Sequence, residues 1–469
     1  MNIKIVFVNL LLLLALFSCE SEDVDLSQPF VAAFSSTSYN LGTIRESQEI
    51  KVVFSETAAS AGVVTIKATA VNAAYKTDYE TIPSAENGFF EIPFEAGDTE
   101  VAFTYINRIV LPFDEEDNDK AITFDVVKID YNSQNSIQGQ TSTVVSFSVS
   151  NGATLFPETG GPNQGNQVFI DLSTELMTTS RRDKWDLGFY NGEQFRVTIN
   201  GSLYMAAKQL NSDNIDAVTP ASVQPYFNQV AIGTFEASNV NYIDAPNGNI
   251  AQTAIAEISS TPSDNKVYLV NMGYQIGTDV PPPGSVAIAG NSRGWKKIRI
   301  LRSGDNYVLQ YADLNSTTHT EATIPKKDTH NFRFFSMVTN SEVTVEPEKN
   351  KWDLNFTVFT NEIVGSGSYG YSDFVVNNLK GGVKVYRVNN SDPEAFGKFA
   401  RADIDNSKFT DDQRIIGADW RDVFSGSAAT DRFYVLKDVD GYYYKIRMLS
   451  FVNPAGVRGY PKFEYKLVQ

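Results

Sequence analysis

Two stretches of the chain share one pattern: Asp183-Lys184-Trp185-Asp186-Leu187-Gly188-Phe189 and Asn350-Lys351-Trp352-Asp353-Leu354-Asn355-Phe356. An aromatic run precedes each stretch, and similar segments follow each one in the same order. The matched pairs are residues 168–172 with 332–337, 267–270 with 433–436, 297–300 with 445–448, and 309–311 with 463–465. This repeated order predicts two diverged copies of one β-rich unit, at residues 164–314 and 330–469.

The shared pattern has the alternation of a β-strand. Its Trp, Leu and Phe point to one side and its Lys and Asp to the other. We therefore expect Trp185 and Trp352 to occupy equivalent buried places. Asp186 and Asp353 are expected to cap a turn or bond the backbone, and a direct role in binding is the alternative.

The motif Lys-Trp-Asp-Leu-x-Phe and three later segments resemble the HmuY family. These later segments are residues 416–424, 433–451 and 459–467. The likeness covers residues 330–469 and 163–315. It implies two tandem HmuY-like units and a haem-binding surface lipoprotein of the kind found in Bacteroidota.

Composition favours an all-β protein. The 469 residues include 31 Phe and 22 Tyr, and long helical periodicity is absent. About three domains are expected for this length, at roughly 150 residues each. The formal net charge of −17 argues against a nucleic-acid partner, because phosphates need Lys and Arg.

The reactive side chains are few. Cys19 is the only cysteine, and His319 and His330 are the only histidines. A disulfide within the chain is thus impossible, and neither histidine stands in a catalytic or zinc motif. Phosphate-binding and dinucleotide motifs are also missing. We expect no enzyme; a hydrolase with paired carboxylates is the alternative.

The N-terminus reads as an export signal over residues 1–19. Lys4 precedes an apolar run too short to span a bilayer. The run ends Leu16-Phe17-Ser18-Cys19, which resembles a bacterial lipobox and implies lipidation of Cys19, for example by palmitate. Residues 20–27 form an acidic tether. These features predict a lipid anchor in the outer membrane at the cell surface; an ordinary signal peptide is the alternative.

Residues 28–150 are predicted to form an immunoglobulin-like β-sandwich. Short alternating strands are expected at residues 30–34, 49–54, 62–68, 89–94, 100–106, 121–129 and 143–149. The segment resembles a Calx-beta domain, and some members of that family bind calcium. Oxygen ligands could come from Asp78, Asp114, Glu115 and Asp117. Arg108 stands where an aspartate is expected, so we predict a solvated acidic loop and little calcium binding.

Pro and Gly indicate a linker at residues 151–163, and residues 315–329 are expected to link the two repeats. The first repeat has a Pro-rich loop at residues 271–294 that the second lacks. Long loops on a β scaffold often bind ligands.

The resemblance implies haem as cofactor, iron acquisition as role and a TonB-dependent outer-membrane receptor as partner. Candidate iron ligands are Met205, Met272 and His330, since haem iron accepts both sulfur and imidazole. Arg293, Lys296 and Lys297 could meet the haem propionates. The alternative is a surface module that binds a glycan or host protein and keeps only the fold.

Overall fold

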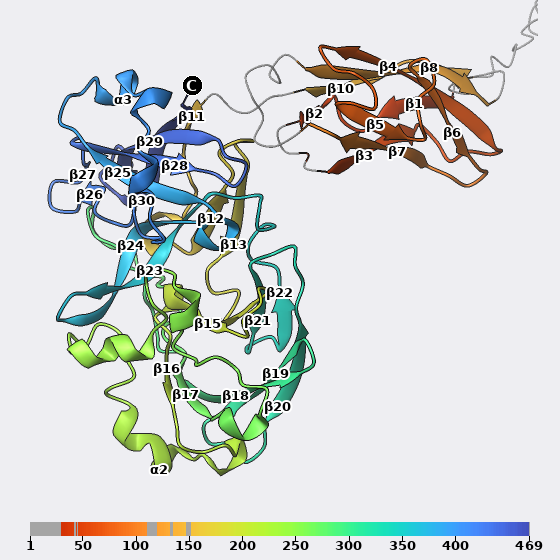
Figure 1. Ribbon diagram of the computed structural model, residues 1–469. Helices are drawn as coiled ribbons and strands as arrows, with labels where there is room; N and C mark the ends of the chain where they lie inside the picture. The colour runs from red at the N-terminus through yellow and green to blue at the C-terminus, as the bar shows by residue number, and fades with distance from the viewer. Residues whose placement is uncertain are drawn as a thin grey trace, which may run out of the picture. The chain divides into compact units, whose positions relative to one another are not determined.

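The computed structural model describes residues 30–41, 44, 46–109, 120–131, 135–146 and 152–468. The chain divides into two compact units, Met1–Ser148 and Val149–Gln469. Strands predominate in both units, and this confirms the all-β class (Figure 1). Within the described residues, no helix has the length and apolar character needed to cross a bilayer.

The first unit is a sandwich of two sheets, which Figure 1 shows as two layers. Phe90 and Phe103 lie on different sheets, and their ring centres are 4.8 Å apart. Alternate residues face this core, as in β6 (Phe89–Phe94), and the predicted sandwich is confirmed. One sheet has the order β5 (Tyr79–Ile82), β7 (Glu100–Asn107), β3 (Ser47–Phe54), β1 (Phe30–Phe34), β9 (Asn135–Ser136). The other has the order β2 (Ser38–Asn40), β10 (Ser142–Ser146), β8 (Ala121–Asp130), β4 (Gly62–Val71), β6 (Phe89–Phe94).

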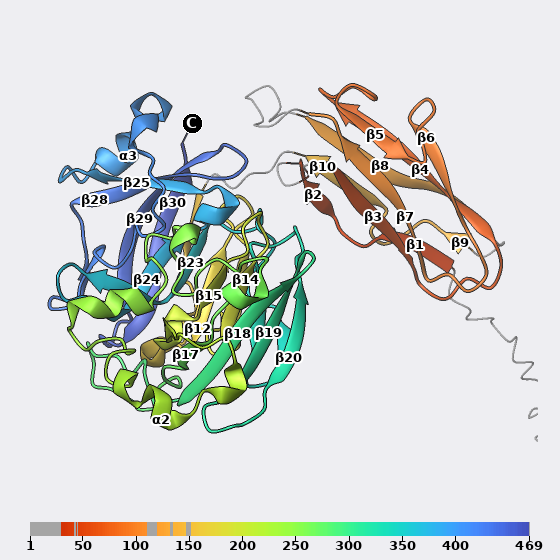
Figure 2. The ribbon, with the colours of Figure 1, turned by 60° about the horizontal axis from the view of Figure 1, so that its bottom comes forward.

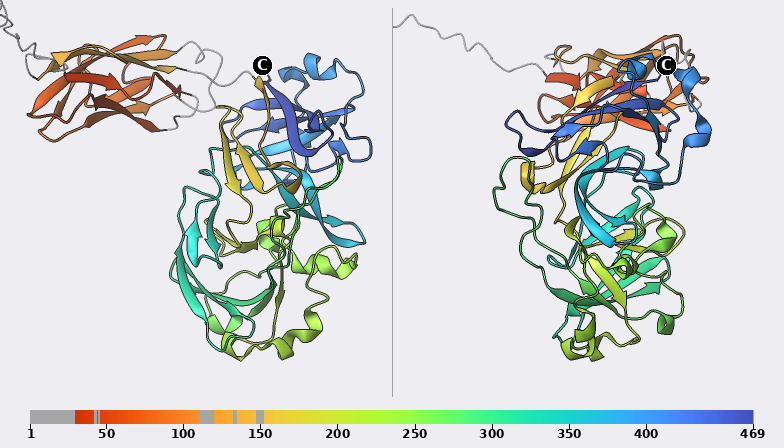
Figure 3. Two further views of the ribbon diagram at one scale, coloured as in Figure 1. Left: turned by 180° about the vertical axis from the view of Figure 1, so that it is seen from behind. Right: turned by 90° about the vertical axis from the view of Figure 1, so that its left-hand side faces the viewer.

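The second unit contains two equivalent five-stranded sheets, which lie at its two ends (Figures 1 and 3). The first is β16 (Ala206–Gln209), β17 (Tyr268–Asn271), β18 (Trp295–Ser303), β19 (Asn306–Asp313), β20 (Thr320–Pro325). The second is β25 (Lys384–Asn389), β28 (Arg432–Lys437), β29 (Tyr443–Val452), β30 (Arg458–Leu467), β11 (Gly152–Leu155). The matching order of strands agrees with an internal duplication.

Two four-stranded sheets join these ends, and each combines strands from both repeats. One is β13 (Met177–Arg181), β12 (Asn166–Ile170), β23 (Leu354–Ile363), β24 (Gly367–Asn377). The other is β15 (Val197–Ile199), β14 (Leu187–Tyr190), β21 (Phe332–Ser336), β22 (Ser341–Val343). In register, Val168 faces Phe356 and Leu187 faces Phe335. Each repeat therefore pairs its motif strand with the aromatic strand of the other.

This exchange changes the expected domain division. Residues 164–314 and 330–469 share sheets and form one compact unit. The expected linkers also carry strands, since β20 lies within 315–329 and β11 within 151–163. Pairing across the repeats buries the apolar face that each motif strand would expose alone.

Short helical turns connect β16 to β17. They include α2 (Pro220–Val223) and lie beside β17 at one end of the unit (Figure 2). Ile215, Val218 and Val223 pack there against Val267 and Leu269. Other short elements include α3 (Ala395–Lys398), β26 (Arg421–Asp422) and β27 (Ser427–Ala428).

Candidate functional site

The second unit carries a surface cleft of about 1150 Å³. Several separate segments form it, including the predicted binding loop at residues 271–294. Its lining residues are Gly160, Asn163, Gly165, Asn166, Arg181, Asp183, Lys184, Met272, Gln275, Ile276, Gly277, Thr278, Arg293, Lys296, Ser336, Val338, Thr339, Ser341 and Val343. Ligand pockets in proteins commonly measure roughly 300–1000 Å³, so the cleft has room for a large ligand.

Arg182 holds the loop of the cleft in place. Its side chain is 1% exposed and donates hydrogen bonds to the carbonyl oxygens of Gln164 (2.7 Å), Ser202 (2.5 Å) and Ile288. Burial lowers the pKa of Arg182 to about 10, which leaves it charged at neutral pH. The cation thus ties the 271–294 loop to the turns that contain Gln164 and Ser202.

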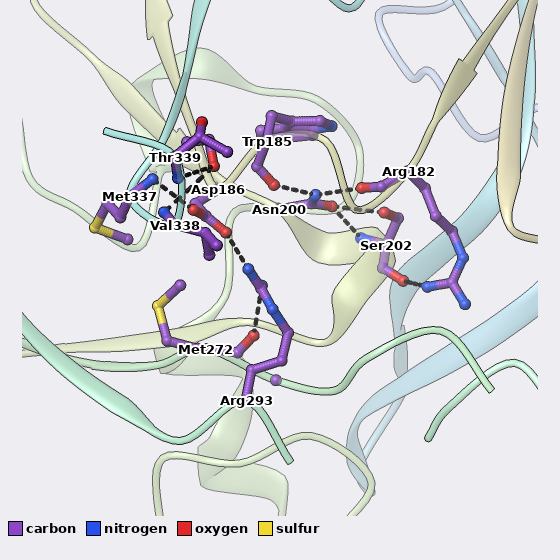
Figure 4. Close-up of polar contacts among 12 residues, drawn as sticks. Arg182, Trp185, Asp186, Asn200, Ser202, Met272, Arg293, Met337, Val338 and Thr339 are labelled. Atoms are coloured by element: carbon purple, nitrogen blue, oxygen red, sulfur yellow. Dashed lines mark hydrogen bonds and ion pairs between the residues drawn. The ribbon is translucent and has the colours of Figure 1, made fainter. Parts of the chain in front are cut away.

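The motif residue Asp186 stands behind the cleft and pairs with Arg293 (Figure 4). Arg293 Nη2 lies 2.6 Å from Asp186 Oδ1, and Asp186 Oδ2 accepts a 2.7 Å hydrogen bond from the backbone N–H of Met337. Arg293 also donates to the carbonyl of Met272. The expectation that Asp186 bonds the backbone is confirmed, and its ion pair also fixes the loop.

The second motif aspartate, Asp353, also bonds the backbone, but its surroundings differ in charge from those of Asp186. Asp353 Oδ2 accepts a 2.8 Å hydrogen bond from the N–H of Leu172, as expected for the second motif aspartate. Among the described residues, no ion pair joins Asp353 to a cation. Burial, followed by the charges of Asp171 and Asp438, raises the pKa of Asp353 well above its ordinary value.

An asparagine supports each motif, and sequence reasoning missed both. Asn200 Nδ2 donates to the carbonyls of Arg182 and Trp185, at 2.8 Å each (Figure 4). Asn378 Nδ2 donates to the corresponding carbonyls, those of Lys349 (2.8 Å) and Trp352 (2.9 Å). The segments between motif and asparagine differ in length, and this hid the correspondence.

The tryptophans have equivalent surroundings, as predicted. Trp185 packs edge-on against Phe334 at 4.8 Å, and Trp352 against Phe169 at 5.0 Å. Both pairs belong to one apolar cluster. Trp352 is 8% exposed, whereas Trp185 is only partly buried.

Four cations line the cleft, Arg181, Lys184, Arg293 and Lys296, although the whole chain is acidic. Arg181 pairs with Asp183, Arg293 with Asp186 and Lys296 with Asp313, whereas Lys184 forms no ion pair among the described residues. The predicted contribution of Arg293 and Lys296 thus agrees with their positions. Lys297 does not contribute, because it is 0% exposed and donates to the carbonyls of Val218 and Ser316.

The three candidate iron ligands line three different hollows. Met205 (0% exposed) and Met272 (1% exposed) belong to the same apolar core cluster. Met205 borders a smaller hollow of about 200 Å³, Met272 borders the cleft, and His330 borders a small depression beside Lys327 and Arg333. Haem iron needs donors that reach one site. These three residues do not provide such a set, so they do not fit haem as a ligand pair.

The other predicted sites belong to the first unit and the N-terminus. Asp78 is paired with Lys120 at 3.1 Å and accepts from the N–H of Ala74 at 2.7 Å. Arg108 pairs with Glu80 at 2.9 Å. Among the described residues, no cluster of His, Cys, Asp and Glu could hold a metal ion. Asp114, Glu115, Asp117 and Cys19 lie outside the described residues.

Solved structures similar to the chain match each unit. The apo-form Calx CBD1 domain covers 25% of this chain and 95% of its own, with 14% identity and a TM-score of 0.21. A protein from Bacteroides vulgatus ATCC 8482, described as HmuY-like and haem-binding, covers 67% and 91%, with 10% identity and a TM-score of 0.15. A protein from Bacteroides fragilis NCTC 9343, described as a lipoprotein, covers 67% and 90%, with 11% identity and a TM-score of 0.15.

No curated protein sequence matches the chain. The family model described as HmuY protein matches residues 163–465, which span both repeats and more than half of the chain. The second unit as a whole is thus one HmuY domain, and the chain belongs to the HmuY family.

Proposed function

We propose that this chain is a lipoprotein, anchored through Cys19 at the outer face of the outer membrane, that binds a large anionic ligand in the cationic cleft. The carrying observation is the large cleft lined by four cations on a chain of net charge −17. Three of these cations have a carboxylate partner, and Lys184 forms no ion pair among the described residues. An unpaired cation in a cleft favours a ligand of the opposite sign. The role is binding rather than catalysis.

Haem is the first candidate ligand. Its two propionates suit a cationic cleft, and an HmuY-like relative is described as haem-binding. We base the proposal on charge and assign no iron ligand, because Met205, Met272 and His330 do not face one site. Iron acquisition through a TonB-dependent receptor would then follow. An anionic glycan is the second candidate, favoured by the same cations and by the lack of a donor set.

The test compares haemin with metal-free protoporphyrin IX, each titrated into the purified protein with and without dithionite. Binding through the carboxylates predicts similar affinities for both compounds and weaker binding at high salt. Lys184→Glu should weaken binding, because it reverses a charge in the cleft. Lys351→Glu is the matched control, since Lys351 is the same motif position in the second copy and does not line the cleft.

Three results would change the proposal. Haemin binding without protoporphyrin binding would show that iron ligation dominates. Binding of a polyuronate with no spectral change for haemin would select the glycan. Equal effects of Lys184→Glu and Lys351→Glu would remove the cleft as the site.

A further inference from the structure

The smaller hollow of about 200 Å³, which both repeats line, is partly open and separate from the cleft. Strands β12, β15, β21, β23 and β24 contribute to its walls, and residues 243–250 form one side. A cavity of about 150 Å³ is enough to hold benzene. The hollow therefore has room for one aromatic ring with a short side chain, and it is too small for haem.

The walls of the hollow are rich in aromatic side chains. Trp185 and Phe332 are only partly buried, and they line the hollow together with Phe334 and Trp352. Aromatic rings attract one another in offset or edge-to-face arrangements, beyond the area that they bury. An aromatic ring in the hollow can thus extend the apolar cluster that the two repeats form where they meet.

Among the described residues, Lys380 is the only cation that lines the hollow. Its side chain is partly exposed, and Nζ donates to the carbonyl of Gly248 at 2.8 Å. An ammonium group has three N–H donors, and Lys380 forms no ion pair in the described part of the chain. A cation that leaves bulk water needs a counter-charge. An unpaired ammonium group beside aromatic walls therefore favours a ligand with a carboxylate.

The two acids of the lining, Asp244 and Glu346, have other partners. Asp244 accepts hydrogen bonds from two backbone N–H groups, at 2.9 Å each, which stabilise its negative charge without Lys380. Glu346 accepts a 2.9 Å hydrogen bond from one backbone N–H. Burial raises the pKa of Glu346 to about 8, so this carboxyl group is mainly neutral at pH 7. The ammonium group of Lys380 thus remains available to a ligand.

Contacts from the second repeat fix the side of the hollow that residues 243–250 form. The backbone N–H of Gln413 donates to the carbonyl of Asn247, and its Nε2 donates to that of Pro246, at 3.0 Å each. Lys380 holds Gly248 in the same way. Because this wall is already in place, a ligand loses little free energy in ordering it.

We propose that the smaller hollow binds a small aromatic carboxylic acid, with its ring against the aromatic walls and its carboxylate on Lys380. This site is independent of the cleft, because different walls and a different cation form it. Either site can therefore fail its own test without affecting the other.

The experiment is calorimetric titration of the purified full-length protein with 3-phenylpropanoate, with 3-phenylpropan-1-ol and nonanoate as comparison compounds. We expect one site per chain that binds the aromatic acid about tenfold more tightly than the alcohol at pH 7, and more tightly than nonanoate. Lys380→Met keeps an apolar stem and removes the charge, so it should weaken binding of the acid about tenfold and leave the alcohol unaffected. Lys384→Met is the matched control, since Lys384 lies outside the hollow and pairs with Asp411 at 2.9 Å.

The pH dependence of binding gives a second readout. Burial lowers the pKa of Lys380 to about 8, so its charge is lost as the pH rises through this value, and Glu346 ionises in the same range. Burial raises the pKa of Asp244 to about 6, so its charge is lost as the pH falls through 6. A carboxylic acid with an ordinary pKa of about 4–5 stays mainly ionised over this range. All three groups therefore predict tighter binding of the acid at pH 6 than at pH 9, with no pH dependence for the alcohol.

Absence of binding of 3-phenylpropanoate at millimolar concentration would overturn the site. Tighter binding of the alcohol or of nonanoate would overturn the ligand class, and equal effects of Lys380→Met and Lys384→Met would remove Lys380 from the site. The melting temperature without ligand and the affinity for the alcohol show whether Lys380→Met keeps an intact hollow. If this variant does not fold, the wild type decides, since an affinity for the acid that does not fall between pH 6 and pH 9 would refute the proposal.

Discussion

Replacing Asp186 with Asn should destabilise the second unit by about 3–5 kcal/mol, the usual cost of removing one partner from a buried ion pair. The side chain of Asp186 is 0% exposed and that of Arg293 is 10% exposed, so water cannot replace the lost carboxylate. An Asn oxygen can still accept from the N–H of Met337, which lies 2.7 Å from Asp186 Oδ2. The substitution therefore isolates the charge pair from the backbone hydrogen bond.

The same substitution in the other copy, Asp353→Asn, should raise the free energy of unfolding at neutral pH rather than lower it. Burial, then Asp171 and Asp438, raises the pKa of Asp353. The folded chain thus binds this proton more tightly than the unfolded chain, whose pKa is about 3.9. Stability is lost as the pH rises from that value through the folded pKa. Asn cannot ionise, so we expect an unchanged free energy of unfolding near pH 4 and a gain of about 1–3 kcal/mol at higher pH.

Urea unfolding followed by tryptophan fluorescence measures both effects. Trp185, Trp295, Trp352 and Trp420 all belong to the second unit, so the signal excludes the sandwich. Equal denaturant slopes for wild type and variants would show that only stability has changed. Equal losses in the two variants, or a loss below about 1 kcal/mol for Asp186→Asn, would refute the assignment of opposite charge environments.

Three further predictions concern the core, the sandwich and the anchor. Trp352→Ala should cost about 3–5 kcal/mol by urea unfolding, and Trp185→Ala less, because Trp185 is only partly buried. Millimolar Ca²⁺ should leave the sandwich melting temperature unchanged, because Asp78 is paired with Lys120; a marked rise by calorimetry would contradict this. Cys19→Ala should move the protein from the membrane fraction to the soluble fraction or leave it unprocessed, and normal membrane retention on immunoblots would exclude the anchor.

The sequence predicted the strands well where alternation is local. The expected strand at residues 89–94 is β6, and that at 30–34 is β1. The pairing of strands was not predictable in the same way. The exchange of β12 and β14 between repeats depends on contacts between residues far apart in the chain, and no local pattern encodes them. Trp185 and Trp352 were recognised as core residues, but their packing in one apolar cluster arises only when the two repeats meet.

The candidate ligands Met205 and Met272 illustrate a second limit of sequence reasoning. Both follow loop-like residues, yet the chain turns them into the core, where a flexible thioether fills space. Met205 and Met272 could ligate iron only if their sulfur atoms were exposed in a binding site. The residue type alone does not predict that exposure. The cations Arg293 and Lys296 could be placed at the cleft because Arg293 belongs to the long loop 271–294 and Lys296 follows it directly.

Divergence of the two copies explains why the cleft occurs beside only the first motif. The backbone bond from Met272 N–H to the Gly294 carbonyl corresponds to the bond from Asp438 N–H to the Tyr442 carbonyl. The first copy joins Met272 to Gly294 with a long loop that supplies Arg293, whereas the second joins Asp438 to Tyr442 with a short turn. With that turn in place, Asp353 faces Asp171 and Asp438 instead of a cation. The longer loop of the first copy thus supplies both a wall of the cleft and the counter-charge of Asp186.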